Sequence, residues 1–208
     1  MKNTSPLVIT ISRQLGSGGG YVGQHLAKNL NLLYLDREIL SQAAKKLSVL
    51  EEDLETYEEK SPSFWQSLFQ ASRAGNPENY LALPVYLPTD QELFRTETEV
   101  IERITKECSA VVVGRCGSHI LGNRPNHVSV LLHAEMAFRK ERVQKIYSVS
   151  KEEAENMIMH SDKERARYYK RFTGSEWMDA RQFDLSVNTG KIGLDTSVEL
   201  IQKYLQLI

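Results

Sequence analysis

Short apolar runs of strand length alternate along the chain with longer stretches in which apolar residues recur every three or four positions. The runs are continuous in Val, Ile and Leu, as in "AVVVG", and do not alternate apolar with polar residues. Such runs are typical of a parallel sheet that is covered by helices on both faces. The predicted strands are residues 7–12, 31–36, 110–114, 127–134 and 183–188.

The longer stretches predict helices. In the first, residues 20–30, the side chains of Val22, Leu26, Ala27 and Leu30 fall on one helical face. The region 37–108 is also predicted to be mostly helical, and it interrupts the alternation as an insertion on the sheet. The whole chain, residues 1–208, is expected to form a single α/β domain. Further helices are predicted over residues 135–148, 150–172 and 194–206.

The composition excludes several classes of partner. The chain has 208 residues and a formal net charge of −1, which gives no overall field to attract DNA or an anionic membrane. No apolar run approaches the ~18 residues of a membrane span, and the N-terminus lacks the pattern of a signal peptide. Cys108 and Cys116 flank a predicted strand and would stand about 26 Å apart, too far to pair. We therefore expect a soluble, cytoplasmic protein that binds neither a nucleic acid polymer nor a membrane.

A cluster of glycines, "GSGGG" at residues 16–20, lies between the first predicted strand and the first helix. Helix N-termini expose unpaired N–H groups, and glycines let the backbone approach an anion closely. Three interpretations compete: a flexible turn, a dinucleotide-binding loop G-x-G-x-x-G at residues 18–23 with Asp36 on the ribose, or a nucleotide-kinase phosphate loop. The long insertion after Asp36 counts against the dinucleotide fold. The kinase pattern G-x-x-x-x-G-K-[ST] is not met either, because no lysine follows the glycines.

Four stretches of the sequence resemble a known protein family. The stretch "ITISRQLGSGGGYVGQHLAKNLNLLYLDREIL" resembles the opening of the cytidylate kinase-like proteins, a branch of the P-loop nucleoside monophosphate kinases. The stretch "AVVVGRCG" is similar to the cytidylate kinase strand that ends in Gly-Arg-Asp-x-Gly. The stretches "SDKERARYYKRFTG" and "FDLSVNTGKIGLD" are similar to the lid helix and last strand of those enzymes. The resemblance extends over nearly the whole chain.

The resemblance implies a fold and a function. The fold is a P-loop NTPase-like three-layer α/β fold with a five-stranded, mostly parallel sheet, the helical insertion 37–108 over the acceptor, and a lid at about residues 160–175. The function is transfer of a phosphoryl group from ATP, with Mg²⁺, to a nucleoside monophosphate, by resemblance CMP or dCMP. The nucleotide phosphates would bind at Gly16, Ser17, Gly18, Gly19 and Gly20.

The acceptor is expected at the carboxyl ends of the strands, where open α/β sheets bind their ligands. Arg115 follows a predicted strand there, and its guanidinium suits a phosphate or a carboxylate. Asp36 and Arg37 end the second predicted strand at the same rim, and they resemble the position from which monophosphate kinases reach the acceptor. Cys116 replaces the acid of the Gly-Arg-Asp motif.

The glycine loop departs from the family pattern where charge matters most. Gly19 stands where a typical kinase has its lysine, and Gly20-Tyr21 stands where it has the Mg²⁺-binding hydroxyl. A working kinase would then need another cation at the β- and γ-phosphates. One candidate is Arg13 beside the loop. The others are Arg165, Arg167 and Arg171 on the predicted lid helix, where a catalytic role competes with a solvated basic face.

Two other functions remain open from the sequence: a nucleotide-binding regulatory protein that has lost the kinase lysine, and an NAD(P)-dependent oxidoreductase. The 5 histidines show no metal-ligand spacing, and no cysteine is near enough to complete a zinc site, so no resident metal is predicted. The expected partner is a small nucleotide, and the sequence leaves a homo-oligomer open.

Overall fold

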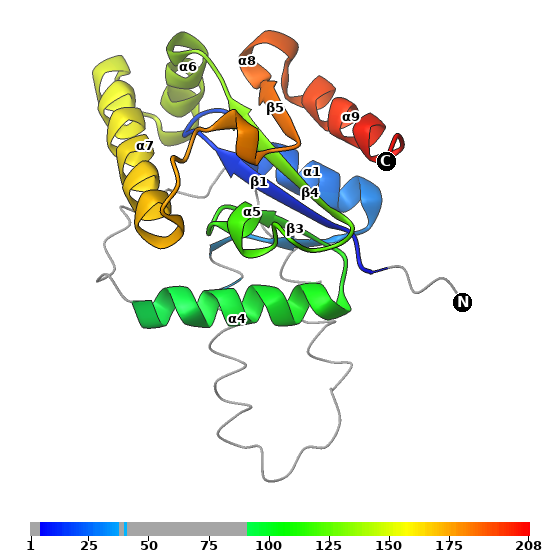
Figure 1. Cartoon of the computed structure of the whole chain (residues 1–208). Coiled ribbons are helices and arrows are strands. Elements are labelled where there is room, and N and C mark those ends of the chain that lie inside the picture. Colours follow the sequence, from blue (N-terminus) through cyan, green and yellow to red (C-terminus); the bar gives the residue numbers. More distant parts are fainter. Residues whose placement is uncertain (1–4, 38–39, 41–90) are drawn as a thin grey trace.

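The computed structural model describes residues 5–37, 40 and 91–208. Its strands are β1 (Val8–Arg13), β2 (Leu33–Leu35), β3 (Ala110–Val113), β4 (His127–His133) and β5 (Leu185–Asn188). The α-helices are α1 (Gly19–Leu30), α4 (Gln91–Glu107), α5 (Gly117–Ile120), α6 (Met136–Tyr147), α7 (Lys151–Thr173), α8 (Thr189–Ile192) and α9 (Leu194–Leu205). A 3₁₀ turn, η1 (Ala180–Gln182), precedes β5, and Figure 1 shows how these elements are arranged.

The five strands form one parallel sheet in the order β2-β3-β1-β4-β5. Val8 of β1 lies opposite Ala110 of β3 on one side and His127 of β4 on the other. The carboxyl end of β1 therefore lies between those of β3 and β4 (Figure 1). The dinucleotide-binding fold places its first strand between the second and the fourth instead. The sheet order thus separates this chain from that fold.

Helices cover both faces of the sheet. On one face α1 packs against β3 and α9, and a Cβ added at Gly23 of α1 would lie 2.8 Å from a methyl of Val113. On the other face α5 packs against β1, and a Cβ added at Gly117 would lie 3.3 Å from methyls of Thr10 and Val112. Successive strand residues face opposite sides, so Val112 and Val113 mark the two faces. Burial on both faces explains the continuous apolar runs in the sequence.

The glycine loop is joined to a separate apolar cluster. The main core includes Val100, Ile101 and Ile104 of α4 together with the strands and α1. The helices α6 and α7 lie side by side (Figure 1) and form a second core with a residue of the loop that follows β1. The buried members of this second core are Leu15, Val143, Ala154 and Ile158. The position of the loop therefore depends on how α6 and α7 pack.

The predicted strands and helices are confirmed, with boundaries that differ by no more than about two residues, as expected for assignments of this kind. The sheet is parallel throughout. Within the predicted insertion 37–108, α4 is helical as expected, whereas residues 41–90 lie outside the described part of the chain. The predicted lid begins inside α7, which is one continuous helix from Lys151. Among the described residues, no helix combines the length and the apolar character needed to span a membrane.

Candidate functional site

The glycine loop after β1 has a backbone conformation that excludes side chains at two positions. Gly16 and Gly18 have φ angles of 82° and 81°, in the left-handed region that L-residues rarely adopt. A Cβ at Gly16 would lie 2.7 Å from the carbonyl oxygen of Arg139, and a Cβ at Gly18 would overlap Leu194 Cδ2. The loop is therefore held close to α6 on one side and to the start of α9 on the other.

This loop leads directly into the N-terminus of α1. Gly18 is the N-cap residue and has no side chain to cap the helix, and its carbonyl accepts the first helical hydrogen bond from the Val22 N–H at 2.9 Å. The N–H groups of Gly19 and Gly20 have no acceptor within the helix, as in the first turn of any helix. Backbone donors and the positive end of the helix dipole thus point out of the loop, an arrangement that binds phosphate.

Ser17 stabilises the loop from inside. Its side chain is fully buried, and its hydroxyl donates to the Gln14 carbonyl at 2.8 Å. The Ser17 carbonyl in turn accepts from the hydroxyl of the buried Thr189 at 2.8 Å. The Ser17 N–H also donates to the Gln14 carbonyl, at 3.3 Å. The hydroxyl and the main chain of Ser17 therefore both hold the loop in shape, and its predicted contact with the phosphates stays a prediction.

The side chain of Arg13 crosses the floor of the site. A Cβ at Gly19 would lie 2.5 Å from Arg13 Cγ, and a Cβ at Gly114 would overlap Arg13 Nη1. The side chain thus runs from the end of β1 over the first residue of α1 to the turn after β3. Burial lowers the pKa of Arg13, while Tyr34 and Asp36 oppose this shift. The stem of Arg13 fills the space where a side chain at position 19 would start, and its guanidinium lies at Gly114.

Arg165 is the residue of the predicted lid set that the structure brings to the loop. Its Nη1 donates to the Arg13 carbonyl at 3.3 Å and lies 3.5 Å from Asp162 Oδ1. Burial, followed by the nearby charge of Arg13, lowers the pKa of Arg165 to about 9, so the group stays charged at neutral pH. The Arg165 guanidinium therefore lies at the end of β1, near enough to Arg13 for the two positive charges to interact.

The other two lid arginines lie on the solvent side of α7. Arg167 pairs with Glu164 at 3.1 Å, and 66% of its side chain is exposed. Arg171 is exposed and lies 5.6 Å from the centre of the Phe172 ring. The structure therefore separates Arg165 from the exposed basic face that the sequence also allowed.

Arg115 follows β3 in a strained turn. Gly114, Arg115 and Cys116 have φ angles of 84°, 54° and 54°, and the Gly117 N–H donates to the Gly114 carbonyl at 3.0 Å. Two successive left-handed residues closed by this bond are the mark of a type I′ turn, which favours Gly, Asn or Asp at its centre. Each non-glycine residue held in this region costs about 1–3 kcal/mol. Such strain persists where the surrounding structure fixes it, often at a functional site.

Glu97 of α4 holds the Arg115 guanidinium at the acceptor rim. Arg115 Nη2 donates to Glu97 Oε1, and the Tyr168 ring of α7 lies 5.6 Å from the Arg115 guanidinium carbon. Glu97 is 2% exposed, and burial raises its pKa against the opposing charges of Arg115 and Arg37. Arg37 is thus an electrostatic neighbour of this pair, and burial lowers its own pKa. The predicted acceptor residues Arg37 and Arg115 do come together.

The remaining predicted residues at this rim are buried. Asp36 is 8% exposed at the end of β2 and raises the pKa of Arg13 electrostatically, so it faces the floor of the site. Cys116 packs with Tyr169 and Trp177, and burial raises the pKa of its thiol to about 12. A thiol that stays protonated at neutral pH lacks the thiolate that acts as a nucleophile. Cys116 therefore replaces the acid of the family motif without its charge.

Three charged residues of the site were missed in the sequence: Glu97, Arg139 and Asp162. Each occupies a position that the apolar stripe of its helix would otherwise fill. Glu97 falls between Phe94 and Ile101 on α4, and Asp162 continues the spacing of Ala154 and Ile158 on α7. A charge in an apolar stripe is the signal that would have identified them.

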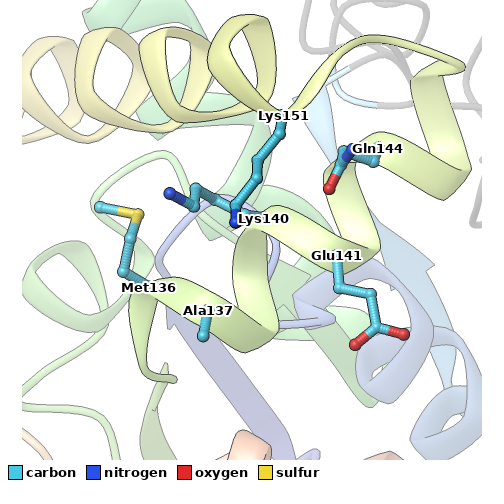
Figure 2. Close-up of a pocket in the computed structure, with 6 residues that line it drawn as sticks. All are labelled: Met136, Ala137, Lys140, Glu141, Gln144 and Lys151. Carbon is cyan, nitrogen blue, oxygen red and sulfur yellow. The ribbon is translucent and has the colours of Figure 1, made fainter.

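A separate recess of about 430 Å³ is formed by α6 and by the first residue of α7, and Figure 2 labels its lining residues. It is lined by Met136, Ala137, Lys140, Glu141, Gln144 and Lys151. None of these belongs to the predicted site. Among the described residues, no three His, Cys, Asp or Glu side chains gather as a metal-binding cluster.

Comparisons with known proteins were consistent with this geometry. A family model described as "Cytidylate kinase-like family" matches residues 8–191. A cytidylate kinase of Thermococcus kodakarensis is 26% identical over 190 residues, which cover 91% of this chain and 82% of the relative. A cytidylate kinase of Sulfurisphaera tokodaii is 24% identical over 203 residues and 97% of both chains.

Solved structures agree on the architecture. A protein described as uncharacterized, from Eubacterium ventriosum, superposes with a TM-score of 0.71 at 25% identity, over 96% of this chain and 98% of the other. A shikimate kinase from Bacteroides thetaiotaomicron superposes with a TM-score of 0.52 at 13% identity, over 96% and 98% of the two chains. The latter likeness shows the fold alone. The fold is P-loop NTPase-like, as the sequence predicted.

Proposed function

The chain belongs to the cytidylate kinase-like family, and on that premise we propose that it transfers the γ-phosphoryl group of ATP to a nucleoside monophosphate, with CMP or dCMP as acceptor. The family accounts for the class of reaction, a kinase acting on a nucleotide. The acceptor base rests on the curated relatives, whose names are cytidylate kinase. The residue roles below are proposals from the geometry.

The position of Arg13 carries this proposal. Phosphoryl transfer depends on cations that neutralise the charge on the β- and γ-phosphates. The loop has no lysine at position 19, but the Arg13 side chain lies over Gly19 and ends at Gly114. The aliphatic stem of Arg13 thus fills the space beside Gly19, and we assign its guanidinium, at the Gly114 turn, to the phosphates that the loop would bind. Arg165 adds a second positive charge at the carbonyl of Arg13, where β1 ends.

The residues of the glycine loop suit the phosphates of a nucleoside triphosphate. The left-handed backbone of Gly16 and Gly18 brings the loop back to the N-terminus of α1, whose first amides have no acceptor within the helix and can bind an anion. ATP, when bound there, supplies the phosphoryl group. Mg²⁺ in such sites is held largely by phosphate oxygens and water, with one or two carboxylates. The absence of a carboxylate cluster among the described residues is compatible with an ion that enters with the nucleotide.

The acceptor phosphate is assigned to Arg115 and Arg37. An oxygen of the acceptor phosphate attacks the γ-phosphorus, the bond from that phosphorus to the β-phosphate oxygen breaks, and ADP leaves. The enzyme forms no covalent intermediate in this scheme. Arg115 orients the attacking group, and Arg13 with Arg165 neutralises the charge on the transferring group. Glu97 competes with the acceptor phosphate for Arg115, because it holds that guanidinium in the structure.

A ligand panel followed by a turnover assay tests the proposal. ADP and ATP should raise the melting temperature, and a ligand at a hundred times its Kd adds about 2.7 kcal/mol of stability. CMP and dCMP should stabilise more than AMP or GMP and should be phosphorylated. The Arg13→Ala variant should lose about 10²-fold or more in kcat, the usual cost of a group that stabilises transition-state charge. Arg181→Ala, an exposed arginine paired with Asp179, is the matched control and should behave as wild type.

The second candidate function is a nucleotide-binding regulatory protein, favoured by the missing lysine. It predicts ADP binding at the loop without transfer to any monophosphate, and Arg13→Ala would then change affinity alone. An NAD(P)-dependent oxidoreductase is disfavoured by the sheet order. Binding of NAD in preference to ADP, lost in Asp36→Ala, would revive it.

A further inference from the structure

One carboxylate on α7 joins the glycine loop to two helices. Asp162 Oδ1 accepts the Leu15 N–H at 2.9 Å, and its Oδ2 accepts from Arg139 Nη1 of α6 at 2.5 Å. Arg165 Nη1 lies 3.5 Å from Oδ1. Asp162 thus accepts one hydrogen bond from the loop and one from α6, and it forms an ion pair with Arg165 within α7.

Leu15, the residue just before Gly16, is held on every side. Its N–H is bound by Asp162, and its carbonyl accepts from Arg139 Nη1 at 3.4 Å. Its side chain is buried in the second apolar core with Val143 and Ile158. Both backbone groups of one loop residue are therefore held by charged side chains from two different helices. Hydrogen bonds to charged groups are shorter and about twice as strong as neutral ones.

This junction is more than a link between helices. Lys140 and Glu155 already join α6 to α7 through an ion pair at 2.6 Å, without a contact to the loop. Asp162 and Arg139 are 18% and 7% exposed, and a largely desolvated ion pair adds little stability compared with an apolar pair of the same volume. What the pair of Asp162 and Arg139 adds is that it fixes the position of the loop backbone. Through Arg165, which donates to the Arg13 carbonyl, Asp162 also fixes the backbone position of Arg13.

We propose that Asp162 is a positioning residue of the phosphate loop. It fixes Leu15 and Arg165, and it thereby couples nucleotide binding at the loop to the position of α7. The inference rests on the proposed function insofar as it takes the loop to bind nucleotide phosphates. Asp162 itself touches no substrate in this role. It acts through the loop backbone and through the two arginines.

Two substitutions at Asp162 separate its tasks. Asp162→Asn keeps an oxygen for the Leu15 N–H, but it sets an amide N–H₂ against the Arg139 guanidinium and removes the charge that orients Arg165. Asp162→Ala removes the acceptor as well. Glu155→Gln is the matched control, because it breaks an ion pair between the same two helices away from the loop.

The experiment combines kinetics with hydrogen exchange. In Asp162→Asn, kcat should fall at least tenfold, whereas the ADP Kd should stay within about threefold of wild type; in Asp162→Ala both should worsen. ADP should slow amide exchange in wild type both at residues 13–20 and at 151–173. In Asp162→Asn the slowing should persist at the loop and disappear from α7. Glu155→Gln should match wild type in kinetics and exchange, whatever its melting temperature.

The outcomes distinguish the two proposals. If wild type transfers no phosphoryl group but ADP protects both segments, the proposed function is wrong and the exchange pattern of Asp162→Asn still decides the positioning role. If Asp162→Asn retains ADP protection of α7, or if it and Glu155→Gln lose kcat alike, the positioning role is wrong. If ADP fails to protect the loop of wild type, both proposals are overturned.

Discussion

Replacing Gly19 should reveal whether Arg13 occupies the place of the lysine. In Gly19→Ala, the new Cβ would lie 2.5 Å from Arg13 Cγ and 2.7 Å from Arg13 Cβ, distances that real Cβ contacts essentially never show. Both atoms belong to the stem of the side chain, which cannot swing away as a flexible tip could. Overpacking of this kind costs about 1–3 kcal/mol. Alanine also gains up to about 1 kcal/mol over glycine in a helix, so a net loss of about 1–2 kcal/mol is expected.

The same substitution in an Arg13→Ala background should be less harmful. That background removes the Cγ and Cδ contacts and leaves the Cβ. The cost of Gly19→Ala should then fall by about 1 kcal/mol or more, within the usual range of coupling between touching residues. Urea unfolding of the four proteins gives the double-mutant cycle. If the cost of Gly19→Ala is the same in both backgrounds within about 0.3 kcal/mol, the Arg13 side chain does not lie over Gly19.

A kinetic version of this cycle restores the family lysine. Gly19→Lys alone should lower kcat, because the lysine stem enters the space of Arg13. Gly19→Lys combined with Arg13→Ala should recover transfer relative to Arg13→Ala, since one cation replaces the other. A gain in kcat from Gly19→Lys alone would show that Arg13 does not supply the charge.

Three further outcomes follow from the same contacts. Glu97→Gln should bind CMP more tightly than wild type, because the ionised carboxylate of Glu97 competes for Arg115. The Kd of wild type divided by the Kd of the variant should therefore grow as pH rises through the raised pKa of Glu97. Titration calorimetry across pH measures this ratio, and a ratio independent of pH would refute the competition. Arg165→Ala should lower kcat much more than Arg167→Ala, which loses one exposed ion pair, and equal losses in steady-state assays would contradict this assignment. Gly16→Ala should be destabilised by a few kcal/mol and should lose ADP binding, because φ at this position is 82° and the new Cβ would press on the Arg139 carbonyl. Thermal unfolding with and without ADP measures both effects, and unchanged ADP affinity would exclude the loop as the nucleotide site.

The sheet could be predicted from sequence because its determinants are local. Each strand is a continuous apolar run, and the period of the first helix appears in Val22, Leu26 and Leu30. The glycine loop was also visible, since a strand, glycines and a helix follow one another within about twenty residues. Local patterns of this kind fix which elements form and in what order.

The site could be predicted only in part, because its contacts join residues far apart in the chain. Arg13 was a candidate from its place beside the loop, but its path over Gly114 depends on the pairing of β1 with β3. Arg165 and Arg167 lie two residues apart on one helix and so fall on different faces, but the sequence does not tell which face packs on the loop. The packing of α7 on the loop turns one inward and leaves the other in solvent. Glu97 and Asp162 carry charge in apolar stripes, and their partners come from other elements.

The strained turn after β3 is in contact with the end of the Arg13 side chain. Arg13 Nη1 occupies the space above Gly114, so residue 114 must lack a side chain. The next two residues, Arg115 and Cys116, have left-handed conformations that cost about 1–3 kcal/mol each. The buried ion pair of Arg115 with Glu97 and the burial of Cys116 fix that geometry. One turn thus makes room for the guanidinium of Arg13 and holds Arg115, the two arginines proposed for the phosphate loop and for the acceptor. A change at Gly114 should therefore impair both halves of the site, and Gly114→Ala should weaken ADP and CMP binding together in a titration where Arg37→Ala weakens CMP alone.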